Sequence, residues 1–461
     1  MKVILGGGLA GLSAAYLLSQ SSRKVLLVDK ESCVGGLAKT INHRNFRFDL
    51  GGHRFLTKNE TVKRFVTDIL ADDILTVSRK SRIYMFDRLI DYPLKPVNAV
   101  FGVGFAAAVK ILADYLKVTV KNAAGTPDRL SMEEWVVSQF GQKMFDLYFK
   151  EYSEKVWGVS CKKLSMEWVA KRIEGLSLGA AIKNAFFKFS GQNIDTLADA
   201  FSYPPRGIGQ IAEALRFAVE KESTVLTDTK VANLYHEDFL IKSASVVNRR
   251  YRDDIHGSEF LSSIPLPVLV RMLKPSPPED VLEASHKLRY RDIMIVTIFL
   301  ERDTVMDLTW MYLPDRNIPF SRIHEPKRWS PHMAADGTTH IVAEYFCFEG
   351  DSMWNSTDEE LTSVTVKQLA KLGLIKKSEV LGSRVVRVPK AYPIHELGYR
   401  EPYGIIMNYL GKFQNLHTIG RTGRFEYLNM DSAIQSGMEA AESILGRSRR
   451  ANREKQAFIR V

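Results

Sequence analysis

Residues 2–29 read KVILGGGLAGLSAAYLLSQSSRKVLLVD, and this stretch decides how the amino-terminal part of the chain folds. It begins with a short apolar run, continues through a glycine-rich turn into a helix-forming segment, and ends with a second apolar run and an acid. This order, with glycines spaced G-x-G-x-x-G, is typical of a strand, helix and strand that bind a dinucleotide. The spaced glycines and the acid are Gly6, Gly8, Gly11 and Asp29.

Each of these four residues has a physical reason for its place. Gly6 permits a tight turn, Gly8 lets the backbone approach a pyrophosphate, and Gly11 lets the helix pack closely on the strand. The helix amino terminus offers unpaired N–H groups and a positive dipole to that pyrophosphate. Asp29 is placed to accept hydrogen bonds from an unphosphorylated ribose, which favours FAD or NAD over NADP.

Two further glycine-rich stretches, VGGL at 34–37 and FDLGGHRF at 48–55, favour FAD over NAD. With them the sequence resembles the FAD-dependent amine oxidase superfamily, which includes protoporphyrinogen oxidases, carotenoid desaturases and UDP-galactopyranose mutases. In that superfamily the double glycines pass close to the flavin, and a carboxyl-terminal helix points its amino terminus at the flavin. The resemblance therefore implies further FAD contacts from Gly36, Gly51, Gly52, His53, Val231, Gly420, Arg421, Asn429, Asp431 and Ser432.

Composition limits the class of protein. The chain has 461 residues, 45% of them hydrophobic and 25% charged, which is ordinary for a soluble protein of two or three domains. Three widely separated cysteines argue against a disulfide framework and for a reducing compartment, and no metal-ligand spacing occurs. The apolar run at 97–109 is too short to cross a bilayer. We therefore expect a cytoplasmic protein with no metal and no transmembrane segment.

The net charge is +11, and residues 447–461 carry six basic residues against one acid. The simplest interpretation is a solvated, frayed tail. Contact with an acidic membrane surface stays open, and we expect no nucleic-acid partner.

The pattern of apolar residues predicts an α/β protein. A Rossmann-type FAD-binding domain is expected from separated segments, with a helical insertion and a second, β-sheet substrate domain. Ser131 and Glu134 have capping-box spacing at the start of one predicted helix, and Ser432 and Gln435 have it at another. The predicted segments are 1–92, 201–265 and 401–446 for FAD, 93–200 helical, 266–400 for substrate, and 447–461 as the tail.

Four stretches narrow the resemblance to UDP-galactopyranose mutases of the eukaryotic type. They occur in the same order as in that family and span most of the chain. The stretches are YSEKVW at 152–157, WMYLPDRNIPFSR at 310–322, AYPI at 391–394 and GRTGRFEY at 420–427.

The resemblance implies a clamp for a diphosphate beside the flavin. Arg322, Arg421 and His53 would be the catalytic residues, because two guanidinium groups can neutralise a pyrophosphate and His53 follows the double glycine. Tyrosine hydroxyls would add hydrogen-bond donors without charge. The implied substrate-binding residues are Tyr92, Tyr312, Arg322, Tyr392, Arg421 and Tyr427. An ion pair for the arginines and simple packing for each tyrosine remain alternatives.

The sequence departs from the mutase pattern mainly where the nucleobase would bind. Asn429–Ser432 reads NMDS in place of Asn-Gln-Asp-His, Lys95 stands where an amide is expected, Trp329 replaces a tyrosine and Ser153 replaces an asparagine. The resemblance thus covers the diphosphate end better than the nucleobase end.

Two functions follow as hypotheses. The first is a mutase that interconverts the pyranose and furanose forms of a nucleotide-linked sugar, UDP-galactose by resemblance, through attack of the reduced flavin N5 on the sugar. It would use an external reductant such as NAD(P)H or a reductase, and would serve cell-surface polysaccharide synthesis. The second is an FAD-dependent oxidase or dehydrogenase of an amine, porphyrinogen or polyene, with 97–109 as a possible apolar entrance. The oligomeric state is not predicted.

Overall fold

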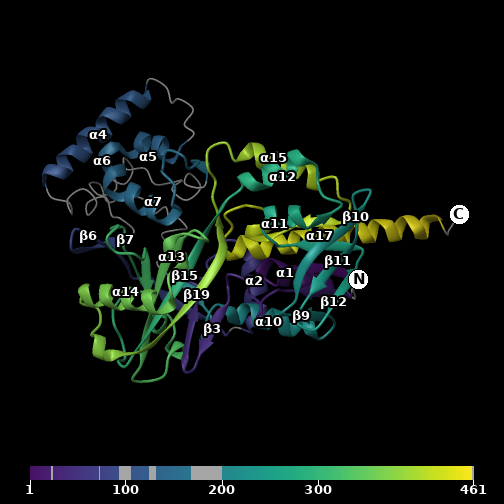
Figure 1. Ribbon diagram of the computed structural model, residues 1–461, viewed down its shortest axis with the longest axis horizontal. Helices are drawn as coiled ribbons and strands as arrows, with labels where there is room; N and C mark the ends of the chain where they lie inside the picture. The colour runs from purple at the N-terminus through teal and green to yellow at the C-terminus, as the bar shows by residue number, and fades with distance from the viewer. Residues whose placement is uncertain (22–23, 72, 93–104, 124–130, 168–199, 459–461) are drawn as a thin grey trace.

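The computed structural model describes residues 1–21, 24–71, 73–92, 105–123, 131–167 and 200–458. Lys95 and the apolar stretch 97–104 lie outside the described residues. Figure 1 shows a helical group, α4 to α7, at one end of the molecule, while the amino-terminal helix α1 and the carboxyl-terminal helix α17 lie toward the other. No helix among the described residues is both long enough and apolar enough to cross a membrane.

The dinucleotide-binding sheet is five-stranded and parallel, with the strand order β20-β13-β1-β2-β9. Its strands come from three separate parts of the sequence, residues 2–28, 224–262 and 416–418, in agreement with an assembly from separated segments. Because parallel strands in such folds are covered on both faces, they read as continuous apolar runs. The strands are β1 Lys2–Leu5, β2 Val25–Val28, β9 Thr224–Leu226, β13 Glu259–Ser262 and β20 Leu416–Thr418.

Helix α1 (Leu9–Gln20) packs against α10 (Gly209–Glu220) and α17 (Met430–Phe458) on this sheet. Two glycines make the close approach possible. A Cβ atom at Gly11 would lie 2.0 Å from the carbonyl oxygen of Gly6, and one at Gly437 would lie 2.0 Å from that of Ala10. The packing role expected for Gly11 therefore has a direct steric cause, and Gly437 has the same role between the first and last helices.

A four-stranded sheet, ordered β12-β11-β10-β14, follows the β8–α10–β9 segment and lies beside the dinucleotide sheet in the fold. Val231, Leu234, Ile241 and Ala244 point into a core that this sheet shares with β1, α11, α12 and α15. The elements are β10 Lys230–Glu237, β11 Leu240–Val247, β12 Arg252–His256, β14 Leu273–Lys274, α11 Leu266–Met272, α12 Glu279–Lys287 and α15 Arg400–Leu410.

The second large sheet has seven strands in the order β19-β15-β18-β17-β16-β6-β7. Strand β15 is buried at every position because its two faces serve two cores: Met294 and Val296 pack toward α14, whereas Ile293 and Ile295 pack against the β3–β4 hairpin. The elements are β6 Ser81–Met85, β7 Arg88–Tyr92, β15 Tyr290–Leu300, β16 Trp310–Tyr312, β17 Arg322–His324, β18 Thr339–Cys347, β19 Val380–Pro393 and α14 Asp358–Lys371.

One predicted boundary is wrong. The sequence assigns residues 81–92 to the FAD-binding segment 1–92, but β6 pairs in parallel with β16 and extends the substrate-domain sheet. This pairing joins Ser81–Ile83 to Trp310–Tyr312, more than two hundred residues apart, so local pattern cannot reveal it.

The helical insertion has its own small core around Val136, Phe140, Phe145 and Trp157. The predicted capping box is confirmed, since Ser131 Oγ accepts from Glu134 N at 3.2 Å and Ser131 N donates to the Glu134 carboxylate at 3.1 Å. The helices are α4 Phe105–Ala123, α5 Met132–Phe140, α6 Gln142–Met144, a π-helix at Phe145–Lys150 and α7 Glu151–Trp157.

Helix α17 differs from prediction at both ends. The capping box expected from Ser432 and Gln435 is wrong, because the helix already begins at Met430 and Gln435 donates to Glu439. The helix also continues to Phe458, so residues 447–458 extend it rather than form a separate tail. Smaller elements are β3 Thr40–His43, β4 Phe46–Asp49, α2 Glu60–Leu70, β5 Leu75–Ser78, β8 Ala200–Tyr203, α13 Ser352–Asn355 and α16 Gly420–Gly423.

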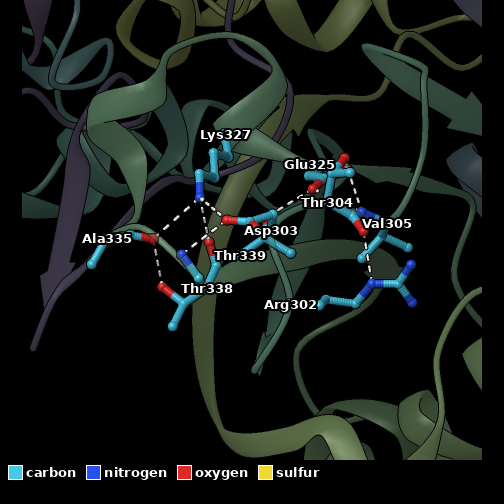
Figure 2. Close-up of polar contacts among 10 residues, drawn as sticks. Arg302, Asp303, Thr304, Val305, Glu325, Lys327, Ala335, Thr338 and Thr339 are labelled. Atoms are coloured by element: carbon cyan, nitrogen blue, oxygen red, sulfur yellow. Dashed lines mark hydrogen bonds and ion pairs between the residues drawn. The ribbon is translucent and has the colours of Figure 1, made fainter.

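A buried carboxylate holds the loop that leads from β15 into β16 (Figure 2). Glu325 is fully buried and accepts hydrogen bonds from the backbone of Val305 and Met306 and from the hydroxyl of Thr339. Lys327 closes the same corner by donating to two backbone carbonyls and pairing with Asp303. The loop is therefore fixed before the chain reaches Trp310 and Tyr312.

We predict that Glu325→Ala lowers the free energy of unfolding by about 3 kcal/mol, because buried backbone N–H groups lose their acceptor. The measurement is the urea midpoint of the FAD-loaded protein. Asp303→Ala is the matched control in the same loop, since the Asp303 side chain is 77% exposed. Equal midpoints for the two variants would contradict a structural role for Glu325.

Candidate functional site

A cavity of about 500 Å³ runs along the carboxyl ends of the parallel strands. In open α/β sheets this edge is where ligands bind, because loops from several strands converge there. Of the residues that the sequence places at FAD, the cavity is lined by Gly6, Gly8, Asp29, Gly36, His53, Val231, Gly420, Arg421 and Asn429.

The phosphate end of the cavity is shaped by the first glycine turn. Gly8 precedes α1 in extended conformation, and a Cβ atom built on it would meet no atom within 4 Å. The space above Gly8 is thus open to a ligand, and the first N–H groups of α1 face an anion there. This arrangement fits the pyrophosphate of a dinucleotide.

Asp29 both lines the cavity and anchors the turn. Its carboxylate accepts from Gly7 N at 2.6 Å and from Glu31 N at 2.8 Å. Burial raises the pKa of Asp29, and the two backbone hydrogen bonds oppose that rise. The residue is therefore held in place before any ribose binds.

Five residues that the sequence places at FAD lie outside the cavity lining. Gly11 packs on Gly6, and Gly51 and Gly52 pack on Glu344 and Arg322. At the start of α17 the lining residues are Met430 and Ala433, which are three positions apart and share one helix face. For that geometric reason the other two, Asp431 and Ser432, are not among the lining residues.

Arg421 lines the cavity and forms a compact group with two of the predicted substrate tyrosines. Its guanidinium lies 5.0 Å from the Tyr392 ring and 4.8 Å from the Tyr427 ring, which stack on each other at 5.7 Å. Arg421 Nε donates to the carbonyl of Leu428 at 2.7 Å. Burial, with Tyr427 close by, raises the pKa of Tyr392 to about 12, so its hydroxyl stays protonated.

The other two predicted tyrosines form a second group. Tyr312 lies edge-on to Tyr92 at 5.0 Å and to Tyr152 at 5.6 Å. Burial and the neighbouring Tyr312 raise the pKa of Tyr152 well above its usual value. Tyr152 was quoted for the resemblance, but the sequence did not single it out as a site residue.

Arg322 is ion-paired, which was the alternative left open from the sequence. Its Nε and Nη2 atoms donate to the two oxygens of fully buried Glu344 at 2.7 and 2.6 Å. Burial opposes the charge of Arg322, but Glu344 outweighs that effect and holds the pKa of Arg322 well above its usual range. Glu344 also accepts from Gly52 N at 2.9 Å. The sequence missed Glu344, which lies in an apolar strand with no motif around it.

His53 lies where the two groups approach each other. Burial lowers the pKa of His53 to about 3, with Arg421 and Arg322 adding to the effect. The imidazole is therefore neutral at physiological pH, and its buried Nδ1 has no hydrogen-bond partner among the described residues. A neutral, unpartnered imidazole beside the cavity can accept or donate one hydrogen bond to a ligand.

Two departures from the mutase pattern have structural explanations. Trp329 is buried among Phe201, Tyr203 and Trp310, so it belongs to the core. Ser153 is buried in α7. In the same stretch, Lys155 donates to the carbonyls of Leu313, Asp315 and Phe320 at 2.6 to 2.9 Å, which ties α7 to the loop after β16. Among the described residues no cluster of His, Cys, Asp and Glu could hold a metal ion.

The open space at Gly8 gives a prediction. Gly8→Val leaves the fold intact, because a Cβ atom at this position meets no protein atom within 4 Å, but it weakens cofactor binding by about 1–3 kcal/mol through crowding. Flavin absorbance per mole of purified protein measures the effect, with circular dichroism as the check on folding. Gly11→Ala is the contrasting variant, since its Cβ would collide with backbone and lower the amount of folded protein. Full flavin content in Gly8→Val would be evidence against a pyrophosphate at this turn.

Comparison with known proteins agrees with this geometry. The family model for flavin containing amine oxidoreductases matches residues 9–445. A structure of reduced UDP-galactopyranose mutase superposes with a TM-score of 0.84 at 21% identity, covering 96% of this chain and 95% of that one. A putative protoporphyrinogen oxidase from Exiguobacterium sp. 255-15 superposes with a TM-score of 0.74 at 16% identity, covering 96% and 98%.

In sequence, the coproporphyrinogen III oxidase of Bacillus subtilis (strain 168) is 20% identical over 96% of this chain and 97% of its own length. The α/β fold with a parallel sheet and further sheets is confirmed by these matches, as is the expectation of FAD. The glycine turn, the open cavity and the family match together identify this chain as an FAD-binding member of the flavin containing amine oxidoreductase family.

Proposed function

We propose that this protein is a mutase that interconverts the pyranose and furanose forms of a nucleotide-linked sugar, with UDP-galactose as the first candidate. The observation that carries the proposal is the group of Arg421, Tyr392 and Tyr427, of which Arg421 lines the cavity. A guanidinium packed against two tyrosines suits a diphosphate, because together they offer charge and several donors. The likeness in fold to UDP-galactopyranose mutase supports the same function.

In this proposal the side chains bind and orient rather than transfer protons. Bound FAD, once reduced by an external donor such as NAD(P)H, supplies the nucleophilic nitrogen. Arg421 holds the diphosphate leaving group, and the two tyrosines fix the position of the sugar. His53 stays neutral and offers one hydrogen bond beside the flavin. Arg322 and Glu344 neutralise each other and hold the loop that carries Gly52 and His53.

A second candidate function is oxidation of a porphyrinogen. The observation that favours it is the match to the coproporphyrinogen III oxidase of Bacillus subtilis, which spans nearly the whole of both chains. A substrate with carboxylate groups could also bind Arg421, because carboxylate and phosphate use the same guanidinium geometry.

The first test is turnover of UDP-galactofuranose with the flavin oxidised and again after reduction with dithionite under nitrogen. We expect UDP-galactopyranose only in the reduced sample, because a mutase needs an electron-rich flavin and no net oxidation. Oxygen consumption with coproporphyrinogen III, and no sugar product in either sample, would favour the second candidate.

The second test concerns Arg421. We expect Arg421→Ala to weaken binding of UDP by about 2–3 kcal/mol, the usual loss for a charge-assisted hydrogen bond. Isothermal titration of the FAD-loaded protein measures this. Arg424→Ala is the matched control, because Arg424 lies three residues on and pairs with the half-buried Glu426. Equal affinities in both variants would remove Arg421 from the substrate site.

A further inference from the structure

The sequence suggested that Arg322 and Arg421 both offer a positive charge to the substrate, but the structure distributes the charges near the two tyrosine groups differently. The charge of Arg322 is neutralised by Glu344, because Arg322 donates two hydrogen bonds to this fully buried carboxylate. His53 is neutral. If the substrate site has a second positive charge, as the resemblance implied, a residue other than Arg322 must supply it at the Tyr92–Tyr312 group.

Arg54 is that residue. It follows His53 directly, and its guanidinium carbon lies 5.1 Å from the centre of the Trp310 ring. Its Nη1 atom is buried and has no hydrogen-bond partner among the described residues. A buried guanidinium N–H without an acceptor is costly, because it has lost water and gained nothing in exchange.

Among the described residues, no acid is one of the main electrostatic neighbours of Arg54. Burial lowers the pKa of Arg54, and the neighbouring cations Arg79 and Arg322 lower it further, while only the hydroxyls of Tyr312 and Tyr92 oppose the shift. A buried arginine with an unused donor is the usual sign of a site for a bound oxyanion.

Arg54 follows a residue of the cofactor cavity directly in the chain. His53, the residue before Arg54, lines the cavity, and Arg322 lies against Gly52, since a Cβ atom there would be 3.3 Å from its guanidinium carbon. Tyr312 and Tyr92 are electrostatic neighbours of Arg54, whereas its guanidinium packs on the Trp310 ring.

We propose that Arg54, rather than Arg322, is the second oxyanion-binding residue of the substrate site and takes a phosphate or carboxylate of the substrate at the Tyr92–Tyr312 group. The choice between phosphate and carboxylate rests on the proposed function: phosphate for a nucleotide sugar, carboxylate for a porphyrinogen. Arg322 is then a positioning residue that acts through Glu344 and Gly52.

The experiment compares FAD-loaded wild-type protein with Arg54→Gln and Arg54→Lys, using UDP and coproporphyrin III as separate probes in isothermal titration. We expect Arg54→Gln to weaken binding of whichever probe the wild type binds about tenfold or more. We expect Arg54→Lys to lose less affinity, because lysine keeps the positive charge but lacks the paired donors of the guanidinium group. Arg82→Gln is the control, since Arg82 lies on β6 and pairs with exposed Asp91.

Thermal unfolding separates binding from structure. Removal of an unpaired buried charge should leave the melting temperature of Arg54→Gln unchanged or raise it. A fall in melting temperature with unchanged affinity for both probes would overturn the proposal, because Arg54 would then serve only to pack on Trp310.

The two probes separate this inference from the proposed function. If UDP binds to the wild type and binds more weakly to Arg54→Gln, the result supports both the role of Arg54 and the nucleotide-sugar function. Binding of UDP that is equal in wild type and Arg54→Gln overturns the role of Arg54 and keeps the nucleotide-sugar function. If only coproporphyrin III binds, and it binds more weakly to Arg54→Gln, the result supports the role of Arg54 and overturns the nucleotide-sugar function. Binding of neither probe to the wild type overturns both.

Discussion

The carboxylate of Glu344 joins the two halves of this protein. It lies on β18, is fully buried, and accepts hydrogen bonds from Arg322 on β17 and from the backbone of Gly52 in the FAD-binding part of the chain. A buried charge needs a partner and satisfied hydrogen bonds, so this contact forces the substrate sheet and the double-glycine loop into one relative position. The positions of His53 and Arg54 follow from it, because they are the next two residues of that loop.

The same contact decides how the site is charged. Arg322 and Glu344 cancel, His53 is held neutral by burial and by the two nearby arginines, and burial raises the pKa of Tyr392, so its hydroxyl stays protonated. The cations that remain at the tyrosine groups, Arg421 and Arg54, are the ones that would meet the anionic substrate proposed above. Such a site relies on binding, on orientation and on the chemistry of its cofactor.

Proteins with different reactions share the fold of this chain, and the reason is physical. A mutase and a putative protoporphyrinogen oxidase both superpose on this chain at low identity. The cofactor domain constrains the backbone in all of them, whereas substrate choice depends on a few side chains at the flavin. Arg421, Tyr392 and Arg54 are therefore better guides to the reaction than overall similarity.

By itself the sequence determined the dinucleotide-binding turn and the Ser131 capping box, because each depends on short-range spacing that any folded context preserves. It also placed Arg421 and its two tyrosines together through the motifs around them. Only the tertiary structure decided that β6 joins the substrate sheet, that Gly437 lets α17 approach α1, and that Glu344 takes up the charge of Arg322. These facts depend on residues brought together from distant parts of the chain, and the partner of a buried charge is chosen by packing rather than by local sequence.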